Sequence, residues 1–387
     1  MDFELSDEQR LLTDSARAFA ARELAPHAGD WDRDHHFPLP VIRRAAEQGY
    51  LALYLKEEDG GLGLSRLSSS LIFEQLAAGC VATTAYLTIH NMASWMLASF
   101  ADEALKAQYL PGLIDGRLLA SYCLTEPDAG SDAAHLRTRA RRDGNDYLLD
   151  GSKCFISGAG STDVLIVMAR TGEDGAKGIS CFLVPADAAG IRYGRNEDKM
   201  GWRAQPTRTI AFDGVRIPAG NRIGPEGQGF VYAMQGLDGG RLNIASCSLG
   251  AAQAALQQSL HYVEERKQFG KPLAEFQALQ FKLADMLTEL TASRQMVRLA
   301  ADKLDRRHAE ASLYCAMAKR FATDQCFAIC NEALQLHGGY GYLSDYPLER
   351  WVRDSRVHQI LEGTNEIMRV IVARRLLQQG GMLDRLL

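Results

Sequence analysis

The order of hydrophobic periodicities restricts the possible folds more than any other feature of this chain. Apolar residues recur at helical spacing over roughly the first 115 residues, alternate in short β-rich runs up to about Gly229, and then return to helical spacing. This order differs from the βαβ repeat of a doubly wound sheet. We therefore predict an α+β multidomain protein: an N-terminal helical domain (1–118), a middle antiparallel sheet or β-barrel (119–229) and a C-terminal four-helix bundle (230–387).

Local signals place the elements. A capping-box start at Ser6 to Gln9 precedes an amphipathic helix, and turn residues separate the β-rich runs, including Arg142–Asn145 and Asp150-Gly151. Helices are expected over about 39–50, 67–79, 84–100, 102–115, 241–265, 275–305, 307–337 and 363–378. Strands are expected around 147–149, 164–168, 179–184 and 209–212.

Composition excludes several classes of protein. The 387 residues are 47% hydrophobic, enough for a large core, and the net charge of −5 without a basic run argues against a nucleic-acid partner or an anionic membrane surface. The N-terminus lacks a signal or transit pattern, and no apolar stretch reaches the roughly 18 residues of a membrane span, so we expect a cytoplasmic protein without a membrane partner. Eight scattered cysteines without a CxxC pair predict reduced, buried thiols and no metal site.

Common catalytic motifs are missing from the sequence. Gly61-Leu62-Gly63 and Gly339-Tyr340-Gly341 lack the third glycine of a dinucleotide fingerprint, and there is no Walker A loop, GxSxG elbow or HExxH pair. These patterns give no support to a Rossmann enzyme, a P-loop NTPase, an α/β-hydrolase or a zinc protease.

One carboxylate has the setting of a proton-transfer group. Glu362 stands directly before a glycine in the segment Ile360 to Glu366, flanked by apolar residues. Burial there would raise the pKa of the carboxyl and make it a useful base. The neighbouring Glu366 lies one turn further on and faces solvent or a cofactor. We therefore predict an enzyme with Glu362 as its base.

Four segments rich in glycine and hydroxyl residues could approach a flat heterocycle or a phosphate: 122–132, 155–160, 335–339 and 362–364. Each alone is also compatible with an ordinary turn. Together, the TEPxxGSD loop (Thr125 to Asp132), the RKQFG segment (Arg266 to Gly270), the QxxGGxGY segment (Gln335 to Tyr342) and the EGT loop resemble the acyl-CoA dehydrogenase family. The resemblance covers nearly the whole chain and implies the helical, β-barrel and four-helix-bundle domains expected above.

The resemblance implies FAD as the cofactor, bound between barrel and bundle. Residues expected at the flavin are Tyr122, Leu124, Thr125, Gly130, Ser131, Phe155, Ile156 and Ser157. Residues expected at the pyrophosphate and adenosine, partly from a neighbouring subunit, are Arg266, Phe269, Phe276, Gln277, Gln335, His337, Gly338 and Gly339. Thr364, Asn365 and Glu366 match a further cofactor segment. A solvated arginine is the alternative for Arg266. Such a shared site implies a homotetramer.

The resemblance also implies which residues bind the substrate. Ser131, the run Asp238, Gly239, Gly240 and Arg241, and Arg374 match positions that receive the coenzyme A thioester, although a solvated helix face is the alternative for Arg374. Some members carry the base where this chain has Gly240, which leaves Glu362 for that role. Phe155 stands where many members have tryptophan and keeps a flat apolar cover for the flavin ring. Asp238 stands where some members have asparagine, and its charge near the pantetheine leaves acyl preference open. Glu126 is expected to be structural.

Several segments, among them 82–86, 89–92, 239–252 and 353–363, are most similar to the branch of the family that acts on isobutyryl-CoA. The expected reaction is dehydrogenation of isobutyryl-CoA to methacrylyl-CoA in valine breakdown, with electrons passed to an electron-transferring flavoprotein. The alternatives are a dehydrogenase of straight short-chain or 2-methylbutyryl-CoA, a non-catalytic flavoprotein that acts as a binding module, and an oxygen-using flavin oxidase. Acyl pocket depth, which decides among the dehydrogenases, depends on packing that the sequence leaves open.

Overall fold

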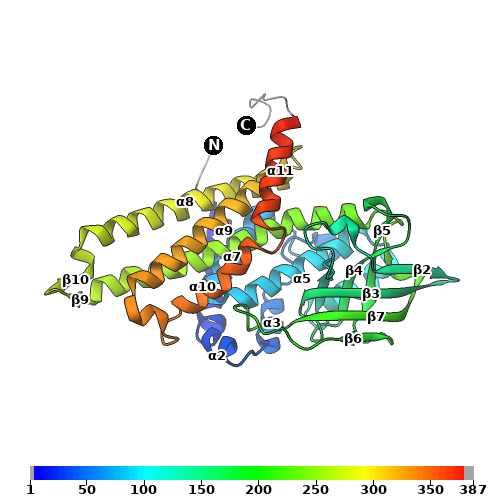
Figure 1. Cartoon of the computed structure of the whole chain (residues 1–387), viewed down its shortest axis with the longest axis horizontal. Helices are drawn as coiled ribbons and strands as arrows, with labels where there is room; N and C mark the ends of the chain where they lie inside the picture. Colours follow the sequence, from blue (N-terminus) through cyan, green and yellow to red (C-terminus); the bar gives the residue numbers. More distant parts are fainter. Residues whose placement is uncertain (1–3, 379–387) are drawn as a thin grey trace.

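The computed structural model describes residues 4–378 and confirms the helical, β, helical order (Figure 1). The ends of the two outer predicted domains, residues 1–3 and 379–387, lie outside the described residues, and the domain boundaries at 118 and 229 stay a prediction. The N-terminal helices are α1 (Asp7–Phe19), α2 (Ala28–Arg33), α3 (Leu39–Glu47), α4 (Arg66–Gly79), α5 (Val81–Phe100) and α6 (Glu103–Ile114). The capping box is confirmed: the Ser6 hydroxyl accepts from the Gln9 N–H, and the Gln9 side chain accepts from the Ser6 N–H.

The middle part is one mixed sheet. Its strands are β1 (Ala120–Cys123), β2 (Arg139–Asp143), β3 (Asp146–Ser157), β4 (Val164–Arg170), β5 (Ile179–Pro185), β6 (Ile191–Tyr193), β7 (Thr207–Pro218) and β8 (Arg222–Ile223). The order is β6-β7-β3-β2-β4-β5-β8, with β1 added to β4. Most pairs are antiparallel as expected, but β1 runs parallel to β4, and β2 meets β4 in a parallel bridge at Arg139 and Arg170. Parallel pairing is possible because neither β1 nor β2 is joined to β4 by a hairpin: β3 comes between them in the chain.

The turn predicted at Asp150-Gly151 is wrong. Both residues lie inside β3, where the pairing with β7 shifts register between Leu149 and Gly151. A β-bulge commonly uses glycine, and here a Cβ on Gly151 would approach Thr138 Cβ to 2.9 Å. The glycine therefore marks a bend within one long strand. The Arg142–Asn145 signal does form the β2–β3 hairpin, with Gly144 at φ 61°.

The C-terminal part consists of α7 (Gly229–Glu265), a β9–β10 hairpin (Lys267–Gln268 and Lys271–Pro272), α8 (Gln277–Asp305), α9 (Ala311–Leu336), α10 (Leu348–Arg356) and α11 (Asn365–Gln378). Helix α7 begins twelve residues before the predicted start near 241. The glycines in this first part lower helix propensity, but tertiary packing outweighs propensity because Gly236, Gly239 and Gly240 are buried against Met96, Arg66 and Glu362.

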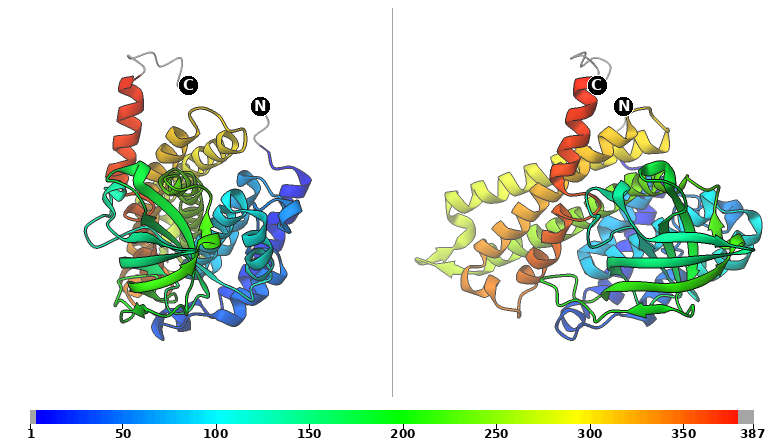
Figure 2. Two further views of the ribbon diagram at one scale, coloured as in Figure 1. Left: turned by 90° about the vertical axis from the view of Figure 1, so that its right-hand side faces the viewer. Right: turned by 45° about the vertical axis from the view of Figure 1, so that its right-hand side comes forward.

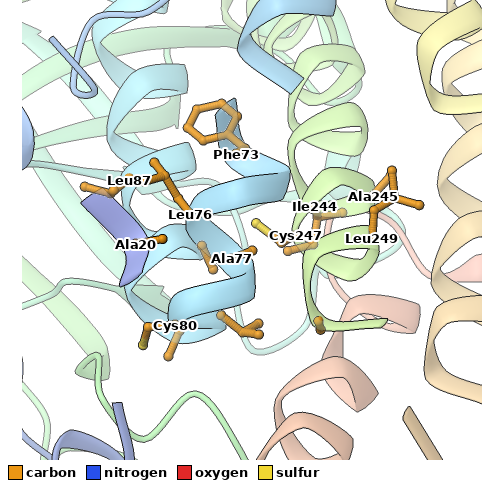
Figure 3. Packing of buried hydrophobic residues seen from close by; sticks show 14 of the residues in the cluster. Ala20, Phe73, Leu76, Ala77, Cys80, Leu87, Ile244, Ala245, Cys247 and Leu249 are labelled. Carbon is orange, nitrogen blue, oxygen red and sulfur yellow. The ribbon is translucent and has the colours of Figure 1, made fainter. Parts of the chain in front are cut away.

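Helix α7 joins the three parts (Figure 1). At its 37 residues it is about 55 Å long. It packs on α4 and α5 of the N-terminal domain and on α8 and α9 of the bundle. Phe73, Leu76 and Ala77 of α4 share one buried cluster with Ile244 and Cys247 of α7, and Figure 3 shows Cys247 pointing toward α4 near Ala77. A Cβ on Gly250 would lie 2.8 Å from that of Ala77, so a small residue is required where the helices cross.

Two further expectations can be compared with the fold. The eight cysteines are free and buried, as predicted. Within residues 4–378 no helix is long and apolar enough to cross a membrane, and no group of three or more histidine, cysteine or acidic side chains is arranged to hold a metal ion.

Helix α11 stands out from the body of the chain in all views (Figures 1 and 2), with only Asn365 and Met368 of this helix buried.

Candidate active site

A cavity of about 760 Å³ lies where the three parts of the chain meet. Helices α5 and α7 give it apolar walls, the ends of β1 and β3 give it hydroxyl and aromatic groups, and the chain from Arg353 to Ile367 closes one side. We call it the catalytic cavity. The lining residues predicted from the sequence are Tyr122, Leu124, Thr125, Gly130, Ser131, Phe155, Ile156, Ser157, Arg241, Glu362, Gly363 and Thr364.

Glu362 lies on a tight turn between α10 and α11. Glu362 and Gly363 have φ values of 56° and 87°, so two consecutive residues adopt the left-handed region. A glutamate rarely adopts this conformation, which costs of order 1–3 kcal/mol unless the surroundings hold it. The Thr364 hydroxyl accepts from the Ile367 N–H and caps α11, so the helix starts directly after the turn.

The Glu362 carboxyl combines access to the cavity with poor solvation. The residue is half-buried and lines the cavity, but its Oε2 is inaccessible to solvent and has no hydrogen-bond partner among the described residues. Burial raises the pKa of Glu362 to about 7, and the nearby charges of Arg241 and Lys319 oppose the rise. A carboxyl with a pKa near neutrality can accept a proton and release it again.

The Glu362 side chain lies against helix α7. A Cβ on Gly240 would come within 2.9 Å of the Glu362 Cδ, so only glycine leaves room for the carboxyl. The next residue, buried Arg241, donates to Asp238 at 2.5 Å, about one turn earlier on α7, and its Nε has no partner in the described part of the chain. Asp238 also accepts from Ser312. The negative charge of Asp238, expected to bear on the substrate, is therefore paired within the protein.

The opposite side of the cavity is built by β1, β3 and the loops after them. The Phe155 ring is 69% exposed, and its backbone has φ 58°, a strained conformation that turns the ring into the cavity. The Tyr122 hydroxyl is buried and lacks a hydrogen-bond partner within residues 4–378. Thr125 and Ser157 add two hydroxyls to the same lining.

A buried ion pair holds this wall. Lys153 Nζ donates to the Leu124 carbonyl at 2.9 Å and to Glu126 at 2.8 Å. The Cys154 N–H of β3 donates to the Thr125 carbonyl and attaches this strand to the loop after β1. Burial alone would raise the pKa of Glu126, but Lys153 and the N–H groups of residues 137 and 138 lower it. Glu126 is therefore structural, as predicted.

A second cavity, of about 700 Å³, lies where α7 ends and collects Arg266, Gln335, His337, Gly338 and Gly339. The Arg266 guanidinium lies 5.6 Å from the centre of the Tyr340 ring, and Tyr262 stacks on His337 at 4.2 Å. His337 Nδ1 bonds to the Ala333 carbonyl at 2.8 Å, while its buried Nε2 has no partner in the described chain. Tyr262 lies about 30 Å along α7 from Arg241, and Arg266 directly follows the end of that helix.

The remaining predicted residues line neither cavity. Phe269 is 93% exposed on the β9–β10 hairpin, in edge contact with Phe276, and Gln277 is exposed at the start of α8. Glu366 and Arg374 are exposed on α11, where Glu366 pairs with Arg369 at 3.5 Å. Asn365 is buried, and its side chain bonds to α9. Asp238, Gly239 and Gly240 lie on α7 beside the catalytic cavity.

Sequence reasoning missed several residues around Glu362. The apolar lining of Ile89, Met92, Phe230, Met234 and Leu237 carries no motif and is found only by packing. Lys319 is fully buried on α9 and donates to the carbonyl of Gly363. A signal for it does exist, because a lysine stands in the buried stripe of Cys315, Ala322 and Cys326. A buried lysine without a partner is rare, so such a position indicates a specific contact.

Comparison with known proteins identifies the family. Three family models match: the N-terminal domain (residues 6–117), the middle domain (121–215) and the C-terminal domain (227–377) of acyl-CoA dehydrogenase. The chain is 53% identical to a mitochondrial isobutyryl-CoA dehydrogenase of Bos taurus, over 97% of this chain and 90% of that protein. It is 51% identical to the protein of the same name from Dictyostelium discoideum, over 96% and 90%.

Solved structures agree with these matches. The butyryl-CoA dehydrogenase of Megasphaera elsdenii superposes with a TM-score of 0.94 at 38% identity, covering 97% of this chain and all of that one. A chain from a structural study of the electron transferring flavoprotein of Acidaminococcus fermentans gives 0.95, with the same identity and coverage. Sequence and fold together show that the chain belongs to the acyl-CoA dehydrogenase family, FAD-dependent oxidoreductases that act on the CH–CH bond of an acyl-CoA.

Proposed function

We propose that the protein dehydrogenates a short branched-chain acyl-CoA at its α,β bond, that isobutyryl-CoA is the substrate and methacrylyl-CoA the product, and that Glu362 is the base. One observation carries the proposal. Glu362 presents a poorly solvated carboxyl to a cavity with mostly apolar walls, with its pKa raised to about 7. The likeness to isobutyryl-CoA dehydrogenases supports this substrate and a place in valine breakdown.

The groups in the two cavities fit FAD. In the catalytic cavity, the exposed face of Phe155 suits a flat ring, and the unpartnered Tyr122 hydroxyl with Thr125 and Ser157 offers hydrogen bonds to a polar heterocycle edge. In the second cavity, Arg266 suits a pyrophosphate and the free Nε2 of His337 suits a polar base edge. Gln335, Gly338 and Gly339 would complete that end.

Each group around the catalytic cavity would have its own role in the reaction. Glu362, when ionised, removes the α-proton. The apolar walls exclude water, which keeps the carboxylate basic and strengthens hydrogen bonds to the thioester carbonyl. Bound FAD supplies the acceptor for the hydride that leaves the β-carbon. Arg241 stays paired with Asp238, and its positive charge favours the ionised form of Glu362. Ser131 lies at the exposed rim, where a coenzyme A chain would enter.

The assignment of the base can be tested with Glu362→Gln. This variant should retain FAD and bind substrate, but should fail to bleach the flavin absorbance when isobutyryl-CoA is added without oxygen. Glu366→Gln is the matched control, since Glu366 is the other nearby acid and is exposed. Loaded with FAD, the Glu366 variant should still bleach when isobutyryl-CoA is added. Full bleaching by the Glu362 variant would overturn the assignment.

A panel of acyl-CoA substrates tests the acyl preference. Single-turnover bleaching rates with isobutyryl-, 2-methylbutyryl-, butyryl- and isovaleryl-CoA should be highest for isobutyryl-CoA. The pocket is bordered by Ile89, Met92 and Leu237, and one added methylene in such a pocket changes the rate about 10–200-fold. A higher rate with butyryl- or 2-methylbutyryl-CoA would favour the alternative dehydrogenases. Absence of bleaching with every substrate would favour a non-catalytic flavoprotein.

An electron-transferring flavoprotein is the electron acceptor that we propose. The likeness to a chain from the Acidaminococcus fermentans study supports it. Reduced protein should be reoxidised by an added electron-transferring flavoprotein much faster than by air. Rapid reoxidation by air alone would favour the flavin oxidase.

A homotetramer with shared cofactor sites is also part of the proposal. The two cavities of one chain are about 30 Å apart along α7. The exposed apolar residues Phe269, Phe281 and Leu287 near the second cavity, and α11 standing out from the body, support subunit contacts there. Light scattering of the FAD-loaded protein should give four times the 42.6 kDa chain mass.

The cytoplasmic location stays a prediction, which cell fractionation would test. The two relatives named above are mitochondrial.

A further inference from the structure

Lys319 is a buried cation directly behind the Glu362 turn. It lies on α9 with 0% of its surface exposed and is not part of the lining of the catalytic cavity. Its Nζ donates to the Gly363 carbonyl at 2.8 Å and to Asn365 Oδ1 at 2.9 Å. The lysine therefore holds the backbone of Gly363 and the side chain of Asn365, one and three residues after Glu362, without lining the catalytic cavity.

Asn365 extends this contact into a network. Its amide nitrogen donates to Thr323 at 2.9 Å and to Asp324 at 2.7 Å. The same Asp324 oxygen accepts from Gln359 at 2.7 Å, just before the turn. Both ends of the turn are thus tied to one face of α9. Such fixation is needed because two consecutive residues of the turn adopt positive φ, and a strained backbone persists only where its surroundings hold it.

The charges around Lys319 come from four elements. Glu362 on the turn, Asp324 on α9 and Glu366 on α11 favour the ammonium form, while burial and Arg241 on α7 oppose it and lower the pKa of Lys319 to about 7. His358, whose pKa burial and Lys319 lower to about 3, is neutral. Conversely, the Lys319 charge favours the ionised form of Glu362. Lysine and glutamate are therefore coupled through the turn that separates them.

We infer that Lys319 is a positioning residue: it holds the Gly363 carbonyl and the Asn365 side chain so that the Glu362 carboxyl stays over Gly240, and its charge favours the ionised form of that carboxyl. This inference rests on the proposed role of Glu362 as the base. Lys319 acts through Glu362 and has no contact with the substrate cavity of its own. A displacement of about 1 Å of a catalytic group can reduce the rate about 100-fold, so the position of the turn matters for the reaction.

The test compares two FAD-loaded variants by anaerobic single-turnover flavin reduction over a range of pH. Lys319→Met removes the charge and both hydrogen bonds that Nζ donates. It should lower the reduction rate about 10–100-fold with little change in substrate Kd, and should move the acid limb of the rate to higher pH. Lys319→Gln retains amide donors but no charge. This variant should recover part of the flavin reduction rate, but the acid limb of its pH profile should stay at the higher pH.

Controls separate this inference from the proposed function. Lys303→Met, which removes a lysine on α8 away from the network, should behave as wild type. If Glu362→Gln reduces the flavin, the proposed function fails. If Glu362→Gln is inactive while both Lys319 variants keep the wild-type rate and acid limb, only the role of Lys319 is overturned.

If the Lys319 variants do not fold, Asn365→Ala provides the test, because it keeps the lysine and removes its second acceptor. A reduced rate with an unmoved acid limb supports positioning by this network. A wild-type rate overturns it.

Discussion

The Glu362 carboxyl lies directly over Gly240, so close that a Cβ on the glycine would be 2.9 Å from the Glu362 Cδ. The two residues are 122 positions apart and belong to α7 and the turn before α11. The absence of a side chain at position 240 therefore does two things. Position 240 itself carries no carboxylate that could compete with Glu362, and the space left by the missing side chain is occupied by the Glu362 carboxyl.

Gly240→Ala should displace the carboxyl and lower the rate of flavin reduction by isobutyryl-CoA about 10–100-fold. FAD content should not change, because position 240 does not line the catalytic cavity. Gly220→Ala is the control, since a Cβ there meets nothing within 4 Å. Equal rates for the two variants would contradict the close approach.

The rate of flavin reduction should rise with pH through about 7. Only the ionised carboxylate can accept the α-proton, and the pKa of Glu362 is raised to about 7, mainly by burial. Stability should have the opposite trend. A glutamate whose pKa is higher in the folded state contributes stability at low pH that is lost as pH rises towards 7. Single-turnover rates on both sides of pH 7 measure the first effect, and an acid limb near the ordinary glutamate value of about 4.3 would contradict it.

Lys153→Met should destabilise the protein and release FAD. The substitution leaves Glu126 buried without its cation, and breaking a buried pair from one side costs about 3–5 kcal/mol. The Leu124 carbonyl also loses its donor, so the wall that holds Tyr122 and Thr125 should loosen. Denaturant unfolding and FAD content after gel filtration measure both effects.

Lys56→Met is the matched control for Lys153, because it removes a lysine from an exposed pair with Glu58. Exposed pairs contribute about 0–1 kcal/mol. A loss of stability as small in Lys153→Met as in this control would show that the buried pair does not hold the wall.

Arg266→Ala should weaken FAD retention without slowing reduction of the FAD that remains. Arg266 lies in the second cavity, far along α7 from Glu362, and its proposed role is to bind the pyrophosphate. Arg306→Ala, an exposed arginine paired with Asp302, is the control. The ratio of FAD to protein after dialysis gives the result, and full retention by Arg266→Ala would contradict the assignment.

Local sequence predicted most of the fold. Capping at Ser6, the helical periodicity of α4 to α6 and the Gly144 hairpin depend on contacts within a few residues, so the sequence contains their causes. Predictions failed where distant contacts decide. Gly151 proved to be a bulge because Thr138 packs against it, and α7 continues through its glycines because other elements cover them.

The candidate site divides in the same way. The sequence alone determined the domain order, the family motifs and Glu362 as the candidate base, since these depend on residue type and spacing. Only the tertiary structure decided what surrounds that carboxyl: Gly240 beneath it, Arg241 and Lys319 near it, and apolar walls from α5 and α7. A pKa depends on burial and on charges brought together from distant parts of the chain, and those distances exist only in the folded protein.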